Sequence, residues 1–138
     1  MATGPEIETL WSSDEAAVTF DRRLGIVRFI RSAAPLPELA VFRALMLELV
    51  ARLDGLARAE LGLIVDTRLA IGRSDDAFEA MMNEFRPRLF GGFRRVAVLI
   101  KTAVGRLQVQ RLARADNLVD RMLVTGDEAE AVAFARRT

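Results

Sequence analysis

The sequence contains no cysteine, no histidine and no tyrosine. Without cysteine the chain cannot form a disulfide, supply a thiolate nucleophile or bind a metal through sulfur. Without histidine it lacks the commonest general base and the commonest zinc ligand. Acid–base chemistry would depend on carboxylates, hydroxyls, arginines and Lys101. The composition therefore argues against an enzyme, and we expect no catalytic residue, no bound metal and no cofactor.

The sequence also lacks a long uninterrupted apolar segment. Its most apolar stretch, residues 36–56, is interrupted by five charged side chains: Glu38, Arg43, Glu48, Arg52 and Asp54. A membrane-spanning helix would need about 20 mostly apolar residues. The first residues contain no basic segment followed by an apolar one, so they do not resemble a secretory signal. We therefore expect a soluble, cytoplasmic protein without a transmembrane segment.

The length and composition are those of one globular domain. The chain has 138 residues, of which 51% are hydrophobic and 28% charged. A domain of this size buries about 68–70% of the surface that its unfolded chain exposes, so it needs no disulfide or metal for stability. Because we find no repeat, no low-complexity tract and no linker, we predict a single domain over residues 1–138.

The first third of the sequence predicts strands. Residues 7–13, 16–20 and 25–31 are short runs rich in β-branched and aromatic side chains. The five residues from Asp21 to Gly25 separate the last two runs and supply a hairpin loop, in which Gly25 can adopt a positive φ. We therefore predict that the chain begins with an antiparallel hairpin.

From Pro35 onward the pattern alternates between helix and strand. A helix is predicted over residues 36–56, with Pro37 near its first turn and Gly55 near its end. Its apolar side chains recur every three or four residues: Leu39, Phe42, Met46, Leu49, Leu53 and Leu56. The apolar run at 61–65 predicts a strand covered on both faces. The spacing of Phe78, Met81, Met82 and Phe85 predicts a second helix that ends before Pro87.

Two further strands and two further helices complete the prediction. Residues 94–100 read as a buried strand, residues 102–115 as a helix and residues 121–124 as a short strand. The four residues from Thr125 to Glu128 have the S/T-x-x-E form of a capping box, which predicts a final helix over 129–136. Strands followed by alternating helices and strands predict an α/β fold. Its mixed sheet begins with an antiparallel hairpin and continues with parallel strands joined by right-handed crossovers, with about four helices.

This order of elements resembles the STAS domain, named for sulphate transporters and anti-sigma-factor antagonists, and especially its small stand-alone SpoIIAA-like branch. The resemblance covers nearly the whole chain. It rests on the element order and on the hairpin VTFDRRLGIVRF, the long helix leading into LGLIVDTR, the acid-ended strand before a helix-opening Ser-Asp, and the closing DEAEAVAF. It implies a non-enzymatic domain of a bacterial regulatory complex. Such a domain binds a protein partner, or in some relatives a small ligand or lipid, at the loop and helix start from Asp66 to Asp76.

The resemblance also implies a switch position at the start of the second helix. In the antagonists, an Asp-Ser-Ser-Gly or Asp-Ser-Thr-Gly motif lies here, and phosphorylation of a hydroxyl in it breaks the partner complex. The corresponding residues are Ser74, Asp75, Asp76 and Ala77, so an aspartate occupies the phosphoacceptor position. Ser74 lies one residue early and aligns with the acceptor only if the alignment slips.

Three interpretations of this helix start remain open. Ser74 or Asp76 can be a plain N-cap, which typically stabilises a helix by about 1 kcal/mol. The aspartates can instead give a partner surface a permanent negative charge near the positive end of the helix dipole. A reversible phosphate would be stabilised by the same free N–H groups.

A second resemblance concerns the ends of two neighbouring strands. Asp66 at one strand end, with Lys101 and Thr102 at the next, is similar to the phosphoacceptor aspartate and its partners in response-regulator receivers. Those receivers need an acidic pair after the first strand and five parallel βα units, whereas this chain begins with a hairpin. The more modest expectation is that Lys101 pairs with Asp66 or Asp75. The predicted partner-binding or switch set is Asp66, Thr67, Arg68, Ser74, Asp75, Asp76, Lys101 and Thr102.

Charge is distributed unevenly along the chain. Residues 1–85 contain 9 basic and 14 acidic side chains, residues 86–115 contain 8 basic and none acidic, and residues 116–138 contain 3 basic and 5 acidic. Because the second helix starts at the carboxyl ends of the strands, it ends at the opposite side of the sheet. A basic surface is therefore predicted there, away from Asp75, formed by Arg86, Arg88, Arg94 and Arg95. The alternative is that these arginines pair with acids elsewhere in the fold, such as Glu84.

A protein partner is the main functional expectation. An acidic partner suits the basic surface. Nucleic-acid binding is expected to be weak and non-specific at most, because the basic segment lacks interleaved aromatic side chains. A homodimer is left open, as are the oligomeric state and the identity of the partner. The alternative function is binding of a lipid or small apolar ligand, in a pocket lined by Phe78, Met81, Met82 and Phe85 instead of a core filled by them.

Overall fold

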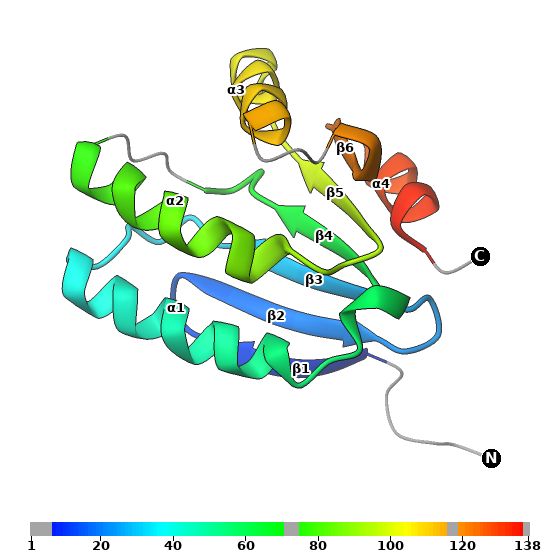
Figure 1. Ribbon diagram of the computed structural model, residues 1–138, viewed down its shortest axis with the longest axis horizontal. Coiled ribbons are helices and arrows are strands. Elements are labelled where there is room, and N and C mark those ends of the chain that lie inside the picture. The colour runs from blue at the N-terminus through cyan, green and yellow to red at the C-terminus, as the bar shows by residue number, and fades with distance from the viewer. Residues whose placement is uncertain (1–6, 71–74, 116–118, 137–138) are drawn as a thin grey trace.

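The computed structural model describes residues 7–70, 75–115 and 119–136, and in it six strands form one mixed sheet whose spatial order equals the chain order (Figure 1). The strands are β1 (Ile7–Ser12), β2 (Ala16–Asp21), β3 (Ile26–Arg31), β4 (Gly62–Asp66), β5 (Arg95–Leu99) and β6 (Met122–Thr125). β1, β2 and β3 pair antiparallel, and β3 to β6 pair parallel. The predicted α/β class with a mixed sheet is confirmed.

The β2–β3 hairpin has the loop that the sequence predicts. Gly25 adopts φ 68°, a left-handed conformation that favours glycine. Its N–H donates to Asp21 O at 2.9 Å, and the N–H of Leu24 donates to the Asp21 carboxylate at 3.1 Å. Asp21 thus closes the turn with both its backbone and its side chain, so the register of the hairpin is determined locally.

Within the described residues, four helices cover the sheet. They are α1 (Leu39–Asp54), α2 (Asp76–Phe90), α3 (Ala103–Ala115) and α4 (Glu128–Ala135), and two short 3₁₀ turns are η1 (Arg58–Glu60) and η2 (Val119–Arg121). The parallel strands follow one another in one direction, so right-handed crossovers place α1, α2 and α3 on the same face. Figure 1 shows α1 and α2 side by side across that face, with α3 beside β6. α4 covers the opposite face.

The two faces of the central strands bury two separate apolar clusters. Leu63 and Val65 of β4 point into the larger cluster, together with Phe42 of α1 and Phe85 of α2. Ile64, between them in sequence, belongs to the smaller cluster beneath α4, which also includes Ile26, Ala97, Leu99, Ala131 and Ala135. This arrangement explains the continuous apolar run at 61–65, because a strand covered on both faces has no solvent side.

The predicted end of α2 is wrong. The helix does not stop before Pro87 but continues to Phe90, with Pro87 inside its last turn. The residue that follows in the apolar stripe, Leu89, is only 2% exposed. Pro87 removes one backbone N–H from the last turn, and burial of a leucine, worth about 1.5–3 kcal/mol, offsets this loss, so packing carries the helix past the proline. The N–H of Gly91 then bonds to Pro87 O at 2.8 Å.

Candidate functional site at the carboxyl edge of the sheet

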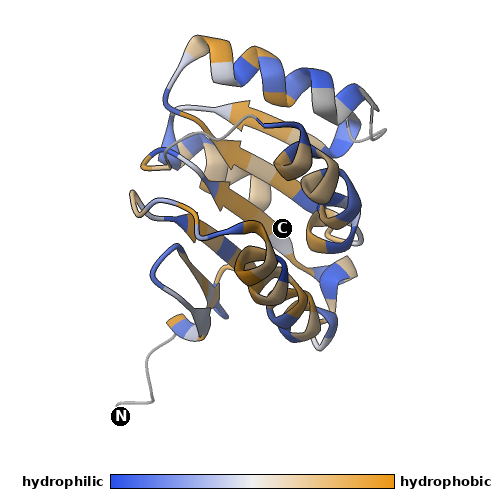
Figure 2. Ribbon diagram, turned by 90° about the vertical axis from the view of Figure 1, so that its left-hand side faces the viewer, coloured by the Kyte–Doolittle hydropathy of each residue, from blue (hydrophilic) through white to orange (hydrophobic). Residues whose placement is uncertain are grey.

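The carboxyl ends of β3, β4 and β5, with the residues that follow them, meet at one side of the sheet, which we call the carboxyl edge; Figure 2 looks onto it. Thr67 joins two of these ends, because its N–H and its hydroxyl donate to Leu99 O at 3.0 and 2.9 Å. Asp66 is paired in register with Leu99, so the segments 66–68 and 100–102 are neighbours. The predicted proximity of these two segments is confirmed.

Asp66 is held by Arg68, two residues further along the chain. The guanidinium contacts both carboxylate oxygens, through Nε to Oδ1 at 3.0 Å and Nη2 to Oδ2 at 2.8 Å, and the Arg68 N–H donates to Oδ1 at 3.1 Å. The Asp66 side chain is only 13% exposed. Burial by itself raises the pKa of Asp66, but the hydrogen bonds and charge of Arg68, with the charge of Arg28, outweigh it and hold that pKa below its ordinary value.

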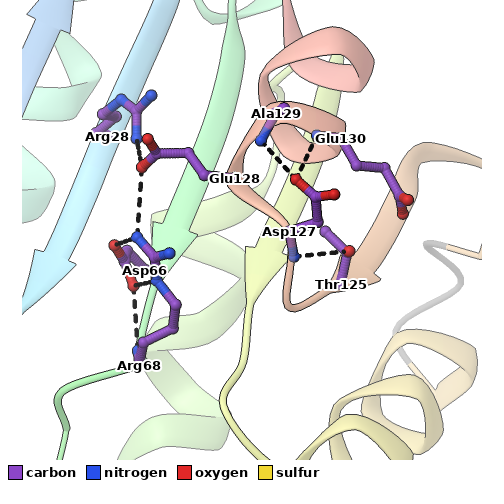
Figure 3. A network of polar contacts seen from close by, with 8 residues as sticks. All are labelled: Arg28, Asp66, Arg68, Thr125, Asp127, Glu128, Ala129 and Glu130. Carbon is purple, nitrogen blue, oxygen red and sulfur yellow. Dashed lines mark hydrogen bonds and ion pairs between the residues drawn. The ribbon is translucent and has the colours of Figure 1, made fainter.

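A further pair extends this arrangement across the sheet (Figure 3). Glu128, the first residue of α4, accepts from Arg68 Nη2 at 3.3 Å and from Arg28 Nη1 of β3 at 3.2 Å. Two acids and two arginines from β3, β4, the following loop and α4 thus form one network. Sequence reasoning missed Arg28 and Glu128. Their charges lie 100 residues apart in the chain, and no local pattern joins them.

Lys101 and Thr102 do not complete a receiver-like site. Thr102 accepts a hydrogen bond from the Gly105 N–H at 3.1 Å, so its hydroxyl serves the start of α3. Lys101 is exposed and makes no hydrogen bond or ion pair within the described residues. The expected pairing of Lys101 with Asp66 or Asp75 is therefore wrong. Arg68 is nearer to Asp66 in sequence and binds it with two nitrogens, an arrangement that an ammonium cannot reproduce.

The start of α2 is capped by Asp75. Its carboxylate accepts from the Phe78 N–H at 2.9 Å, and its φ of −80° and ψ of 155° are those of a residue outside the helix. Asp76 is the first helical residue and faces the positive end of the dipole. The prediction of a helix cap is confirmed, but the capping residue is Asp75 and not Ser74 or Asp76. Ser74 lies outside the described residues.

The start of α4 uses the same device, and here the predicted capping box is wrong. The cap is Asp127, whose carboxylate accepts from the N–H groups of Ala129 and Glu130 at 2.9 and 3.3 Å (Figure 3). Thr125 ends β6, and its hydroxyl accepts from the Asp127 N–H at 3.1 Å. Because Thr125 remains in the strand, Glu128 begins the helix. Its side chain is then free to bind Arg28 and Arg68.

Two neighbouring cavities open at the carboxyl edge, and both are lined by Arg68 and Lys101. One, of about 370 Å³, lies between the loop after β4 and α3, next to Ile100, Gly105 and Val109. The other, of about 410 Å³, is lined by Ile30, Arg31, Asp66, Arg68, Leu69 and Lys101. Ligand pockets commonly have volumes of about 300–1,000 Å³, so both are large enough for a small molecule.

Arg31, the last residue of β3, is a member of this site that sequence reasoning missed. Its Nε donates to Glu15 O at 3.4 Å, whereas its Nη2 is buried without a hydrogen-bond partner. Burial lowers the pKa of Arg31, and the charge of Glu15 offsets part of this effect. The signal was present in the sequence: the strand-end argument that unites Asp66 and Lys101 applies equally to the residue that ends β3.

Large apolar side chains are also exposed at the carboxyl edge. Leu69, Val104 and Leu107 are 65%, 76% and 64% exposed, the highest values among the large apolar residues described. Val104 and Leu107 lie three residues apart on α3 and therefore share a face. Figure 2 shows α3 at the top of the view, with hydrophobic segments between hydrophilic ones. Leu69 belongs to the loop that borders the same cavities.

The predicted basic residues lie at the opposite side of the parallel strands, which we call the amino edge. Arg94 donates to Arg136 O at 2.7 Å, and Arg95 donates to Phe134 O at 3.2 Å, both at the end of α4. Arg86 Nη2 donates to Asn83, and Arg88 lies 5.3 Å from the centre of the Phe85 ring. Glu84 pairs with Arg43.

A further arginine, Arg58 of η1, supports the end of α2 at the amino edge. Its Nη1 donates to Arg88 O at 2.9 Å and to Gly91 O at 2.8 Å. The carbonyls at the end of a helix have no partner within it and carry partial negative charge, so arginines are well suited to bind them. Arg58, Arg94 and Arg95 thus serve the fold, although the sequence alone presents the last two as a free basic surface.

The residues proposed for an apolar pocket belong to the core. Phe78, Met81 and Phe85 are 9%, 7% and 0% exposed, and Met82 packs against the same cluster. The rings of Phe42 and Phe78 lie 5.7 Å apart. This packing favours a structural role for the four side chains of α2 over a ligand-binding role.

Comparison with known proteins identifies no relative: no family model, no characterised protein and no solved structure matches the chain. The resemblance to STAS domains accordingly stays a prediction from the element order and local motifs. Within the described residues, no helix combines the length and apolar character needed to span a bilayer. The same residues contain no cluster of three or more potential metal-ligating acids.

Proposed function

We propose that this protein is a non-enzymatic, STAS-like interaction domain of a bacterial regulatory complex, and that its protein partner binds at the carboxyl edge. The observation that carries the proposal is the exposure of Leu69, Val104 and Leu107 at that edge. Apolar side chains that remain in water when the fold is complete are typical of a surface that a second protein covers. Asp75 and the start of α2 lie on the same edge.

Charge next to these residues indicates the character of the partner. Lys101 is exposed beside the apolar group, and Arg111 is exposed on α3. Arg111 follows Leu107 by four residues and Val104 by seven, so all three share one helix face. An acidic rim around an apolar centre on the partner would complement this surface, and it would steer association as well as select the partner.

Affinity purification with matched variants tests the proposal. Leu69→Glu and Leu107→Glu place a charge in the proposed interface, whereas Leu47→Glu places one on α1, where Leu47 is 43% exposed. Wild type and Leu47→Glu should recover the same partner from the host that encodes the protein. The other two variants should lose about tenfold or more in affinity for that purified partner, as for central interface residues.

Circular dichroism shows whether each variant is folded. Equal recovery with all three variants would contradict the proposed surface. Recovery of no specific partner by wild type would contradict the interaction-domain assignment itself. A turnover activity that a folded Asp66→Asn or Lys101→Ala variant loses would also overturn it, because these are the groups left for acid–base chemistry at this edge.

A further inference from the structure

The cavity of about 410 Å³ at the carboxyl edge carries an excess of positive charge. Arg31, Arg68 and Lys101 line it, and Asp66 is the only carboxylate among the lining residues that the structure describes. Asp66 is occupied by Arg68 through two nitrogens. Glu128 and Arg28, which extend the network, cancel each other in charge. With three cations against one carboxylate, the described lining has a net excess of two positive charges, and Glu15, which is not among the lining residues, offsets part of the charge of Arg31.

The two cations differ in a way that points to a ligand. Lys101 is exposed and has no ion-pair partner among the described residues. Arg31 is partly buried, and its Nη2 has lost water without gaining a hydrogen bond. A buried guanidinium nitrogen without an acceptor is costly, since charged groups lose more on burial than neutral ones. Because Arg31 and Lys101 both line the cavity, an oxyanion there would offer the Arg31 guanidinium a charged acceptor and meet Lys101 at the same time.

We infer that this cavity binds the phosphate group of a small phosphorylated organic molecule, with Arg31 and Lys101 as its charged contacts. A phosphate monoester carries about −1.5 to −2 charge at neutral pH, which matches the free charge of the lining. Ile30 and Leu69 provide apolar surface for the organic part. Because the strand order never reverses, no crevice is dictated by topology, and the side chains themselves must form the pocket.

This inference goes beyond the proposed interaction domain and does not depend on it. Binding is measured on the isolated protein, so the pocket and the docking surface can fail separately. Calorimetric titration compares inorganic phosphate, phenyl phosphate and phenyl sulfate, which has the shape of phenyl phosphate but one negative charge fewer. We expect phenyl phosphate to bind most tightly, by about tenfold over phenyl sulfate if one charge-assisted contact is lost. Binding of phosphate equal to that of phenyl phosphate would restrict the site to the free anion and contradict the organic part of the assignment.

Three variants locate the site. Arg31→Met keeps the aliphatic stem and removes the guanidinium, and Lys101→Gln removes an exposed charge with little risk to the fold. Each should weaken phenyl phosphate binding by about tenfold or more. Arg52→Gln, on the exposed side of α1, is the control and should bind as wild type does.

The ligand-free stability of the first variant separates binding from structure. If Arg31 serves a ligand, Arg31→Met should leave the melting temperature nearly unchanged, since removing the buried unpartnered Nη2 offsets the loss of the long Nε bond to Glu15 O. The inference is overturned if wild type shows no saturable binding up to about 10 mM ligand, roughly tenfold above a dissociation constant of 1 mM. It is equally overturned if Lys101→Gln and the folded Arg31→Met bind phenyl phosphate as tightly as wild type.

Discussion

At the amino edge of the parallel strands, arginines bind the chain's own backbone, whereas at the carboxyl edge two cations have little or no protein partner. Arg58, Arg94 and Arg95 donate to carbonyls at the ends of α2 and α4. Arg31 keeps an unbonded nitrogen and Lys101 is unpaired within the described residues. Similar side chains therefore have different roles at the two edges. At the amino edge the helix ends offer carbonyl groups to the arginines, whereas at the carboxyl edge the helices start and offer N–H groups instead. Substitutions at the amino edge should cost stability, and those at the carboxyl edge should chiefly change binding.

The largest effect is expected from Gly62→Ala, at the amino edge. A Cβ at Gly62 would lie 2.0 Å from the carbonyl oxygen of Ala135, which is backbone and cannot rotate away. α4 would have to move off the sheet, and we expect a loss of about 3 kcal/mol or more in unfolding free energy. Gly55→Ala is the control, because its nearest neighbour would be at 3.5 Å. Chemical denaturation measures both, and equal stabilities would refute tight packing at this edge.

Arg58→Met should have the next largest effect. The Arg58 side chain is 13% exposed, binds the carbonyls of Arg88 and Gly91, and lies 5.3 Å from the centre of the Phe93 ring. Its loss leaves two helix-end carbonyls without their donor, which should cost about 2 kcal/mol. Arg52→Met, an exposed arginine on α1, should cost much less. If the two variants unfold at the same denaturant concentration, the arginine is not structural.

Asp66→Asn should have a smaller effect that depends on pH. The pKa of Asp66 is lowered in the folded protein, so its contribution is fully present above the unfolded-state pKa of about 3.9 and is lost as the pH falls through the lower folded value. At neutral pH the variant should lose about 1.5 kcal/mol. Its stability should approach that of wild type at low pH. A difference that does not change with pH would show that the ionised carboxylate is not what matters.

The smallest effect is expected from Asp75→Ala at the carboxyl edge. Loss of the cap on the Phe78 N–H should cost about 1 kcal/mol. Asp75→Arg should cost little more in stability but should weaken partner binding, because it places a long side chain in the proposed docking edge where a short carboxylate lies. If binding of the identified partner is unchanged in a folded Asp75→Arg variant, the docking surface excludes the start of α2.

Periodicity and turn chemistry predicted much of this fold because they act locally. The hairpin at Gly25, the stripe of α1 and the two-sided strand at 61–65 all follow from neighbours in sequence. The predictions of helix ends were wrong where residues distant in sequence determine the structure. Burial of Leu89 carried α2 past Pro87, and the position of Thr125 in the sheet moved the cap of α4 to Asp127.

The site was less accessible to sequence reasoning than the fold. Strand ends brought Asp66, Thr67 and Lys101 to one edge, as predicted. The partners could not be foreseen, because Asp66 pairs with Arg68 instead of Lys101, and Arg68 also pairs with Glu128. Which cation finds a carboxylate depends on side-chain geometry across three elements, and charge counts along the chain do not contain that information.

The strands have the same order in the sheet as in the chain, and this affects how the protein folds during its synthesis. Each strand pairs with the strand made just before it, so no segment must wait for a distant one and the search for contacts is short. A nascent chain can add β4, β5 and β6, in the order of their synthesis, each beside the outermost parallel strand already in the sheet. α4 follows all six described strands in the chain and packs against Ile26, Ile64 and Ala97. The Glu128 network would then close only when this helix docks, after all six described strands have been made.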